Sequence, residues 1–305
     1  MKNIVVLMST YNGEKYLREQ IESILKQVGC HVQLLVRDDG STDNTLNILQ
    51  EYKTKGKLGI IEGKNLKPAK SFMNLILLAP EAEYYAISDQ DDVWKKTKLI
   101  RAISMLDKDD KQQMLLYCSN LEAVDEYLNT VQKKLLPQIV NVNYKELLIH
   151  SPYLFGCTMV FNKTLCNYIK AEPCPENLIM HDLWIGLICA AHGKIIYDNI
   201  PNILYRQHNE NHTGASISSK TKWKNRWDYL FGQKKFSISL QAKELLKYLN
   251  KKLIQDVDLI EYTEIVASYP LSFRNKIKYL KNIKKGSMNY KQLSFHVILI
   301  LLGRL

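Results

Sequence analysis

Short apolar segments alternate with amphipathic segments along the first ninety residues of the chain. Each apolar segment suits one buried strand, and each amphipathic segment has the apolar spacing of a helix. We expect strands over 4–8, 32–36, 58–61 and 84–87, helices over 14–27 and 71–78, and between them a helix capped by Thr42 or Asp43. This alternation predicts an α/β fold in which helices cover both faces of a mostly parallel sheet.

Beyond residue 94 the pattern is mixed. We expect helices over 98–106 and 178–191, and strands over 115–119, 155–161, 194–197 and 203–205. From about residue 219 only helical patterns remain, over 227–231, 240–253, 265–280 and 292–302. The sequence therefore predicts an α/β domain over 1–218 and a helical region over 219–305.

Polar clusters follow three of the predicted strands, at Ser9–Gly13, Arg37–Ser41 and Ser88–Asp92. Sheets of this kind bind their ligands at the carboxyl ends of the strands. The functional site should therefore lie where the three clusters meet.

The third cluster carries three carboxylates, on Asp89, Asp91 and Asp92. Three such groups within four residues repel one another unless a cation or solvent compensates them. Oxygen ligands of this type suit Mg²⁺ or Mn²⁺, which keep open positions for phosphate oxygens. A solvated acidic turn is the alternative. Because the cluster follows a buried strand and stands beside Trp94, we predict a metal site.

The first two clusters have the composition of a nucleotide pocket. The Asp39 carboxylate can accept a hydrogen bond from a base or a ribose, and Gly40 permits a tight turn. Tyr11 can stack on a base. Each cluster taken alone is equally consistent with a strand-to-helix turn.

Several motifs, taken in order, resemble a known family. STYNGEKYL at 9–17, RDDGSTDNT at 37–45 and SDQDDVW at 88–94 look like the family 2 glycosyltransferases of the GT-A fold. FGCTMVFN at 155–162, MHDLW at 180–184 and YRQHNENHTG at 205–214 are similar to the branch with bacterial rhamnosyltransferases of cell-surface polysaccharide synthesis. The resemblance implies a Rossmann-like, mostly parallel central sheet flanked by helices, with the basic helical region as an extension.

The resemblance also implies roles for individual residues. The nucleotide-sugar contacts fall on Thr10, Tyr11, Glu14, Asp39, Asp89, Gln90 and Arg206. The ligands of Mg²⁺ or Mn²⁺ fall on Asp91, Asp92 and His208, with Asp91 as first choice. The catalytic base falls on Asp182, and the acceptor contacts fall on Trp184 and His181. Judged by its position alone, Asp182 also suits a first-turn helix acid.

The implied reaction is transfer of a sugar from a nucleotide-sugar to a glycan or lipid-linked acceptor, with inversion at the anomeric carbon. The resemblance favours dTDP-L-rhamnose as the donor and leaves UDP-sugars open. A nucleotidyltransferase is a rival, but Ser9–Gly13 is not a glycine-rich basic phosphate loop. A nucleotide-sugar-binding module without activity is a second rival, and Asp182 argues against it.

The net charge of +11 comes from the end of the chain. Residues 221–305 hold 17 Lys and Arg against 6 Asp and Glu, whereas residues 1–220 hold 25 of each. A basic helical region with interleaved aromatic residues is typical of contact with an anionic membrane surface. A helical cap or a homo-oligomer contact is the alternative. Nucleic acid is not expected as a partner, because the charge avoids the motif-bearing domain.

The six cysteines have neither paired spacing nor histidine neighbours typical of zinc sites. The first apolar run is too short for a signal peptide. We therefore expect reduced thiols in a cytoplasmic protein, held peripherally at the inner face of the cell membrane.

Overall fold

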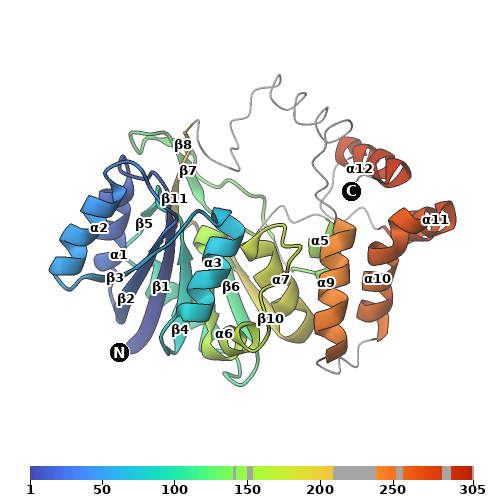
Figure 1. Cartoon of the computed structure of the whole chain (residues 1–305), viewed down its shortest axis with the longest axis horizontal. Coiled ribbons are helices and arrows are strands. Elements are labelled where there is room, and N and C mark those ends of the chain that lie inside the picture. Colours follow the sequence, from blue (N-terminus) through green and yellow to red (C-terminus); the bar gives the residue numbers. More distant parts are fainter. Residues whose placement is uncertain (140–141, 150–153, 209–237, 252–256, 284–289, 304–305) are drawn as a thin grey trace. The chain divides into compact units, whose positions relative to one another are not determined.

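The computed structural model describes residues 1–139, 142–149, 154–208, 238–251, 257–283 and 290–303 (Figure 1). The chain divides into two compact units. Unit 1 comprises residues 1–142, 153–174 and 180–211, and unit 2 comprises residues 143–152, 175–179 and 212–305. Two short segments from the middle of the sequence thus belong with the C-terminal helices.

A seven-stranded sheet forms the centre of unit 1, in the order β10-β6-β9-β4-β1-β2-β3. Its strands are β1 (Lys2–Thr10), β2 (Cys30–Asp38), β3 (Leu58–Glu62), β4 (Tyr84–Ser88), β6 (Leu115–Ser119), β9 (Val160–Asn162) and β10 (Lys194–Asp198). All neighbouring pairs are parallel except the two that involve β9. The predicted mostly parallel sheet is confirmed.

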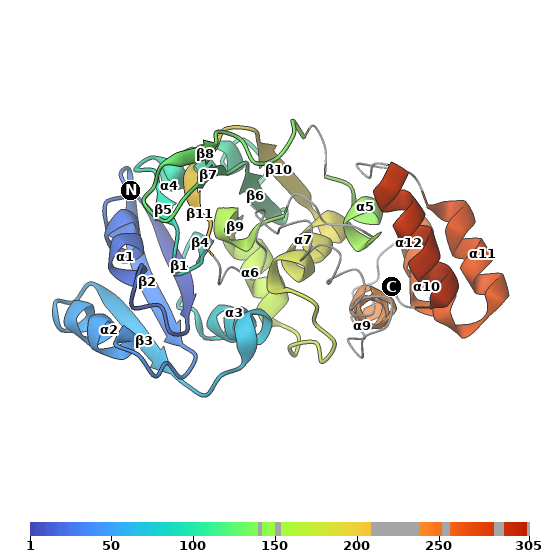
Figure 2. The same cartoon turned by 90° about the horizontal axis from the view of Figure 1, so that it is seen from above.

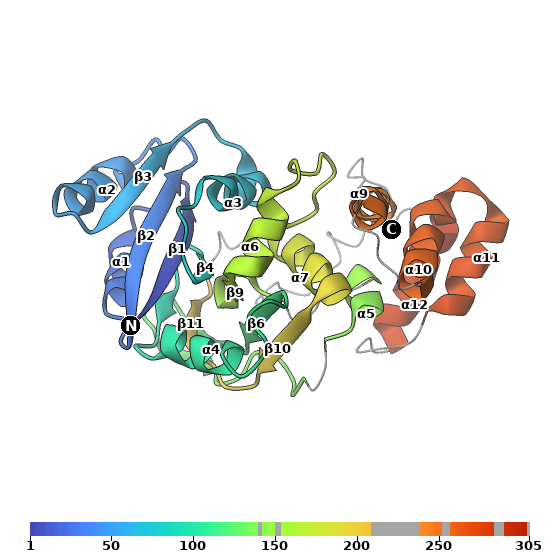
Figure 3. The ribbon, with the colours of Figure 1, turned by 90° about the horizontal axis from the view of Figure 1, so that it is seen from below.

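Helices cover both faces of this sheet (Figures 2 and 3). One face carries α3 (Lys67–Leu78), α6 (Lys163–Lys170) and α7 (His181–His192). The other carries α1 (Leu17–Leu25), α2 (Thr45–Thr54) and α4 (Lys98–Leu106). Helix α2 begins later than predicted, and its flanking residue is Asn44. Asp43 still serves the helix start, because its carboxylate accepts a hydrogen bond from the Thr45 amide at 3.0 Å.

Strand β9 is shorter than the strand predicted over 155–161. A 3-10 turn, Gly156–Thr158, precedes it. The Thr158 amide and hydroxyl both donate to the Phe155 carbonyl, at 2.9 and 2.8 Å. These bonds fold the apolar run back on itself, so only its last part is extended. Because β9 runs antiparallel, its start lies at the edge where the parallel strands end.

A second, four-stranded sheet has the order β5-β11-β7-β8. Its strands are β5 (Val93–Trp94), β7 (Glu122–Val124), β8 (Thr130–Gln132) and β11 (Ile203–Arg206). Strand β11 pairs antiparallel with β5, directly after the acidic cluster. This pairing holds the end of β11 against the cluster, although the two segments are far apart in sequence.

Unit 2 is helical. Its described helices are α5 (Tyr144–Ile149), α9 (Ile238–Lys251), α10 (Val257–Ser268), α11 (Phe273–Asn282) and α12 (Tyr290–Leu302). A buried contact of 2.8 Å between the hydroxyls of Tyr144 and Thr263 joins α5 to α10. Among the described residues, no helix combines the length and the apolar character needed to cross a membrane.

The single helix predicted over 265–280 is wrong. Helix α10 ends at Ser268, a 3-10 turn covers Tyr269–Leu271, and α11 begins at Phe273. Pro270 causes the break, because it has no amide hydrogen and its ring restricts the preceding residue. Ser272 then caps α11 by accepting from the Asn275 amide at 3.1 Å. The helix predicted over 227–231 lies outside the described residues.

Candidate active site

The side chain of Gln90 joins the first polar cluster to the third. Its carbonyl oxygen accepts from the Thr10 hydroxyl at 2.6 Å and from the Tyr11 amide at 2.9 Å. Its amide group donates to the Tyr11 carbonyl at 3.2 Å. A Cβ atom at position 13 would lie 2.5 Å from the same Gln90 oxygen, so Gly13 leaves room for this link. The ends of β1 and β4 are thus locked together, and Tyr11 itself stays 46% exposed.

Glu14 and Asn12 join the first cluster to the second. The Glu14 carboxylate accepts from the Asn44 amide at 2.8 Å. The Asn12 side-chain oxygen accepts from the Thr42 amide at 2.8 Å, and the Asn12 backbone adopts a positive φ of 48°. The role that the structure gives Glu14 is therefore to hold the turn before α2.

Asp39 is buried at the end of β2. Its carboxylate is ion-paired with Arg37 and accepts from the amides of Leu66 and Lys67, both at 2.9 Å. Only 2% of Asp39 is exposed. The residue therefore fixes the loop before α3, while the exposed Tyr11 side chain is the open part of the predicted nucleotide pocket.

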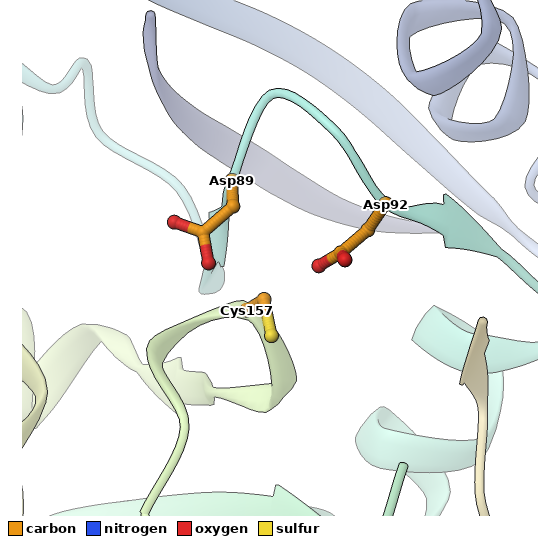
Figure 4. Close-up of side chains that lie close together, drawn as sticks. All are labelled: Asp89, Asp92 and Cys157. Carbon is orange, nitrogen blue, oxygen red and sulfur yellow. The ribbon is translucent and has the colours of Figure 1, made fainter. Parts of the chain in front are cut away.

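The side chains of Asp89 and Asp92 point into the protein and are called the inner half of the acidic loop; Asp91 is its outer half. Ligand atoms of Asp89, Asp92 and Cys157 all lie within 4.8 Å of one another, and Cys157 comes from the turn before β9 (Figure 4). Burial, reinforced by Asp91 and Asp182, raises the pKa of Asp89 to about 7. Burial raises the pKa of Asp92 and of the Cys157 thiol well above their usual values. One Asp92 oxygen has no hydrogen-bond partner among the described residues.

The outer half of the loop presents Asp91 to His208. The imidazole Nε2 lies 2.7 Å from the Asp91 carboxylate, and the two side chains are 14% and 19% exposed. The structure thus brings together two of the three predicted metal ligands. The third, Asp92, turns inward to Asp89 and Cys157.

Arg206 is held by protein groups around the acidic loop. Its Nε donates to the Asp91 carbonyl at 2.9 Å, and its backbone amide donates to the Asp92 carboxylate at 3.3 Å. Its two terminal nitrogens donate to the Glu126 carbonyl and to the Glu19 carboxylate. The predicted donor contact is thus a buried residue, and 2% of it is exposed.

Asp182 lies in the first turn of α7, partly exposed. One oxygen accepts from the Leu183 amide at 2.7 Å and the other from the Gly156 amide at 3.2 Å. Gly156 has to be small, because a Cβ atom there would lie 2.6 Å from His181 Nε2. The turn before β9 therefore orients Asp182 as well as supplying Cys157.

His181 and Trp184 belong to the core of unit 1. The His181 ring stacks on Phe72 with 4.1 Å between ring centres, and burial lowers its pKa. His181 is 3% exposed and Trp184 is 1% exposed. Both rings were predicted to contact the acceptor, but in the structure neither ring has an exposed face.

Lys98 is not among the site residues predicted from the sequence. Its ammonium group is buried, lies 3.6 Å from the centre of the Trp94 ring, and has no hydrogen-bond partner among the described residues. Burial lowers its pKa to about 7, while the nearby Cys157 and Asp92 oppose that shift. A signal was present, because Lys98 stands four residues after Trp94 on the apolar side of the predicted helix.

The fold is shared with known glycosyltransferase structures. The S. aureus TarS fragment 1–349 superposes with a TM-score of 0.57 over 99% of this chain and 81% of its own, at 17% identity. TarS 1–349 in complex with UDP superposes with a TM-score of 0.56 over 93% of this chain and 76% of its own, at 19% identity. Unit 1 with its mostly parallel sheet therefore has the GT-A fold.

The family is defined by sequence. The profile of "Glycosyl transferase family 2" matches residues 5–166. The dTDP-rhamnosyl transferase RfbG of Shigella flexneri is 32% identical, over 72% of this chain and 80% of its own length. The Escherichia coli enzyme WfgD is named a UDP-Glc:alpha-D-GlcNAc-diphosphoundecaprenol beta-1,3-glucosyltransferase. It is 31% identical over 54% of this chain and 62% of its own length. This chain belongs to the family 2 glycosyltransferases.

Proposed function

We propose that this glycosyltransferase transfers L-rhamnose from dTDP-L-rhamnose, with inversion, to a glycan or lipid-linked acceptor in cell-surface polysaccharide synthesis. The observation that carries the proposal is the similarity to RfbG, which spans four-fifths of that enzyme. The named activity of WfgD supports the alternative of a UDP-hexose donor.

The outer half of the acidic loop is the proposed metal position. A carboxylate oxygen of Asp91 and an imidazole nitrogen of His208 are suitable donors for Mn²⁺ or Mg²⁺, and their partial exposure leaves room for phosphate oxygens. A bound divalent cation neutralises the charge that develops on a departing nucleoside diphosphate. Asp91 and His208 would hold it.

Asp182 is the proposed base. Two backbone amides hold its carboxylate in place, and its partial exposure allows contact with an acceptor. A base within hydrogen-bond reach of the acceptor hydroxyl removes its proton as the oxygen attacks the anomeric carbon. Attack from the face opposite the leaving diphosphate inverts the configuration.

A donor comparison tests the proposed substrate. Purified protein with Mn²⁺ would be given dTDP-L-rhamnose, UDP-glucose or UDP-N-acetylglucosamine in turn, with nucleotide release and thermal stabilisation as readouts. We expect the largest stabilisation and the fastest release with dTDP-L-rhamnose. Preference for a UDP-sugar would reject the rhamnose donor and leave the family assignment intact.

We also propose that unit 2 binds an anionic membrane surface at the inner face of the cell membrane. Phe273 at the start of α11 is 70% exposed, Leu302 at the end of α12 is 54% exposed, and Arg274 and Lys281 on α11 are exposed. Helices that present exposed apolar and basic side chains bind anionic lipid surfaces. A membrane position would suit a lipid-linked acceptor.

Sedimentation with vesicles tests the membrane proposal on the full chain. We expect the wild type to sediment with phosphatidylglycerol vesicles and not with phosphatidylcholine vesicles. Arg274→Glu with Lys281→Glu should abolish sedimentation, and Lys53→Glu with Lys55→Glu, which reverses two exposed lysines of unit 1, should not. A changed oligomeric state with unchanged sedimentation would instead assign these side chains to a subunit contact.

A further inference from the structure

Arg206 connects three segments that are distant in sequence. Each of its three guanidinium nitrogens donates to a protein acceptor, and those acceptors belong to Asp91, Glu126 and Glu19. Glu19 lies on α1 and its side chain is 50% exposed, whereas the Arg206 side chain is 2% exposed. A buried guanidinium is stable only where such acceptors surround it. Arg206 therefore holds the main chain of the acidic loop at Asp91.

Tyr16 connects Arg206 to His208, the residue whose imidazole lies beside the Asp91 carboxylate. Arg206 lies over the Tyr16 ring, with its central carbon 4.5 Å from the ring centre. The same ring lies 5.1 Å from the His208 ring, at an angle of 39°. His208 follows Arg206 by two residues at the end of β11, and Tyr16, the residue just before α1, contacts both side chains.

We propose that Arg206 and Glu19 are positioning residues that set the distance between Asp91 and His208 and thereby the affinity of the site for a divalent cation. The proposal rests on the proposed metal position. Groups just outside the ligands orient them, and their loss typically weakens metal binding by about 10- to 100-fold. A guanidinium with all three nitrogens bonded to protein groups is suited to this task more than to contact with the donor diphosphate.

Glu19→Ala tests the proposal with the least risk to the fold, because Glu19 is half exposed. We expect the Mn²⁺ concentration for half-maximal activity to rise roughly tenfold, with an unchanged donor KM at saturating Mn²⁺. Mn²⁺ binding without donor, followed by electron paramagnetic resonance, should weaken by the same factor. Arg206→Lys, which keeps the charge and loses the forked geometry, should weaken Mn²⁺ binding at least as much.

Arg18 and Glu51 provide a matched control. Arg18 lies beside Glu19 on α1 and makes two hydrogen bonds to the Glu51 carboxylate, at 2.8 and 2.7 Å, away from the acidic loop. Glu51→Ala removes a carboxylate from an arginine of the same helix and should leave Mn²⁺ affinity unchanged.

Three outcomes would overturn the assignment in distinguishable ways. A wild-type enzyme indifferent to metal removal would reject the metal position itself. A metal-dependent wild type whose Glu19→Ala and Arg206→Lys variants raise the donor KM at unchanged Mn²⁺ affinity would make Arg206 a donor contact. Variants that lose only thermal stability would show a purely structural role.

Discussion

The two halves of the acidic loop after β4 differ in surroundings although they share residue types. Asp91 points outward to His208 at 2.7 Å and is partly exposed. Asp92, the next residue, points inward to Asp89 and Cys157 and is 1% exposed. The chain bends at Gln90 and Asp91 before it enters β5 at Val93. Asp91 is therefore suited to binding a cation from solution, whereas the carboxylate of Asp92, the next residue, is held in the core.

The largest expected effect concerns Asp182, which belongs to neither half of the loop. Asp182→Asn keeps the side-chain size and removes the base, although its single amide oxygen can accept from only one of the two backbone amides, Leu183 or Gly156. We expect kcat to fall by about 1,000-fold, with nucleotide binding by calorimetry nearly unchanged. A variant with full activity would mean that the proton leaves by another route.

Asp91→Asn tests the outer half. A neutral amide is a poor ligand for a divalent cation, so metal-dependent donor binding should weaken by about 100-fold. The melting temperature should move little, because Asp91 is partly exposed. Equal donor affinity with and without a chelator, in both proteins, would contradict the outer metal position.

Lys98→Met tests the surroundings of the inner half, because Lys98 is buried near Cys157 and Asp92. The quantity measured is the dependence of folding stability on pH. The pKa of Lys98 is lowered to about 7 by burial, so from pH 7 to 10 the unfolded chain keeps a proton that the folded chain has released. Unfolding then takes up a proton, and stability rises with pH in this range. The wild type should gain up to about 1.4 kcal/mol per pH unit relative to the variant.

Urea unfolding at pH 7, 8 and 9 measures this difference. Lys96→Met, which alters an exposed lysine two residues away, is the control and should follow the wild-type slope. Parallel curves for the wild type and Lys98→Met would mean that Lys98 keeps an ordinary pKa.

The smallest effect is expected for Asp92→Asn. Burial raises the Asp92 pKa well above its usual value, so asparagine removes a negative charge that the surroundings of Asp92 disfavour. Asparagine also keeps an oxygen for the Arg206 amide, which donates at 3.3 Å. The Mn²⁺ concentration for half-maximal activity should change by less than about threefold. A loss as large as that of Asp91→Asn would move the metal to the inner cluster of Asp89, Asp92 and Cys157.

The spacing of apolar residues along the sequence predicted most of the strands and helices of the α/β domain. The apolar runs at 4–8 and 84–87 became β1 and β4, and the polar residues directly after them became the edge of the site. Helix 98–106 and strand 115–119 have the predicted bounds. Pro270 was a visible signal for the break between α10 and α11, but the apolar spacing across it favoured one helix.

The side-chain directions could not be predicted, because they depend on pairs far apart in the chain. The contact between Asp91 and His208 joins residues 117 positions apart, and it exists only because β11 pairs with β5. Gln90 was predicted to contact the nucleotide-sugar, yet its side chain accepts a hydrogen bond from the Thr10 hydroxyl and so links the ends of β4 and β1. Asp92 likewise lies near Cys157, which belongs to the turn before β9 and is distant in sequence.

The antiparallel strand β9 has a consequence for the order in which the protein assembles. Strands β4 and β6 both pair with β9 and not with each other, although β6 follows β4 in the chain. During synthesis each keeps an open edge until residues 160–162 have emerged. Unpaired strand edges are sites of aggregation. A chain interrupted before Val160 should therefore need a chaperone to stay monomeric, whereas one interrupted after β10 contains every strand of the seven-stranded sheet.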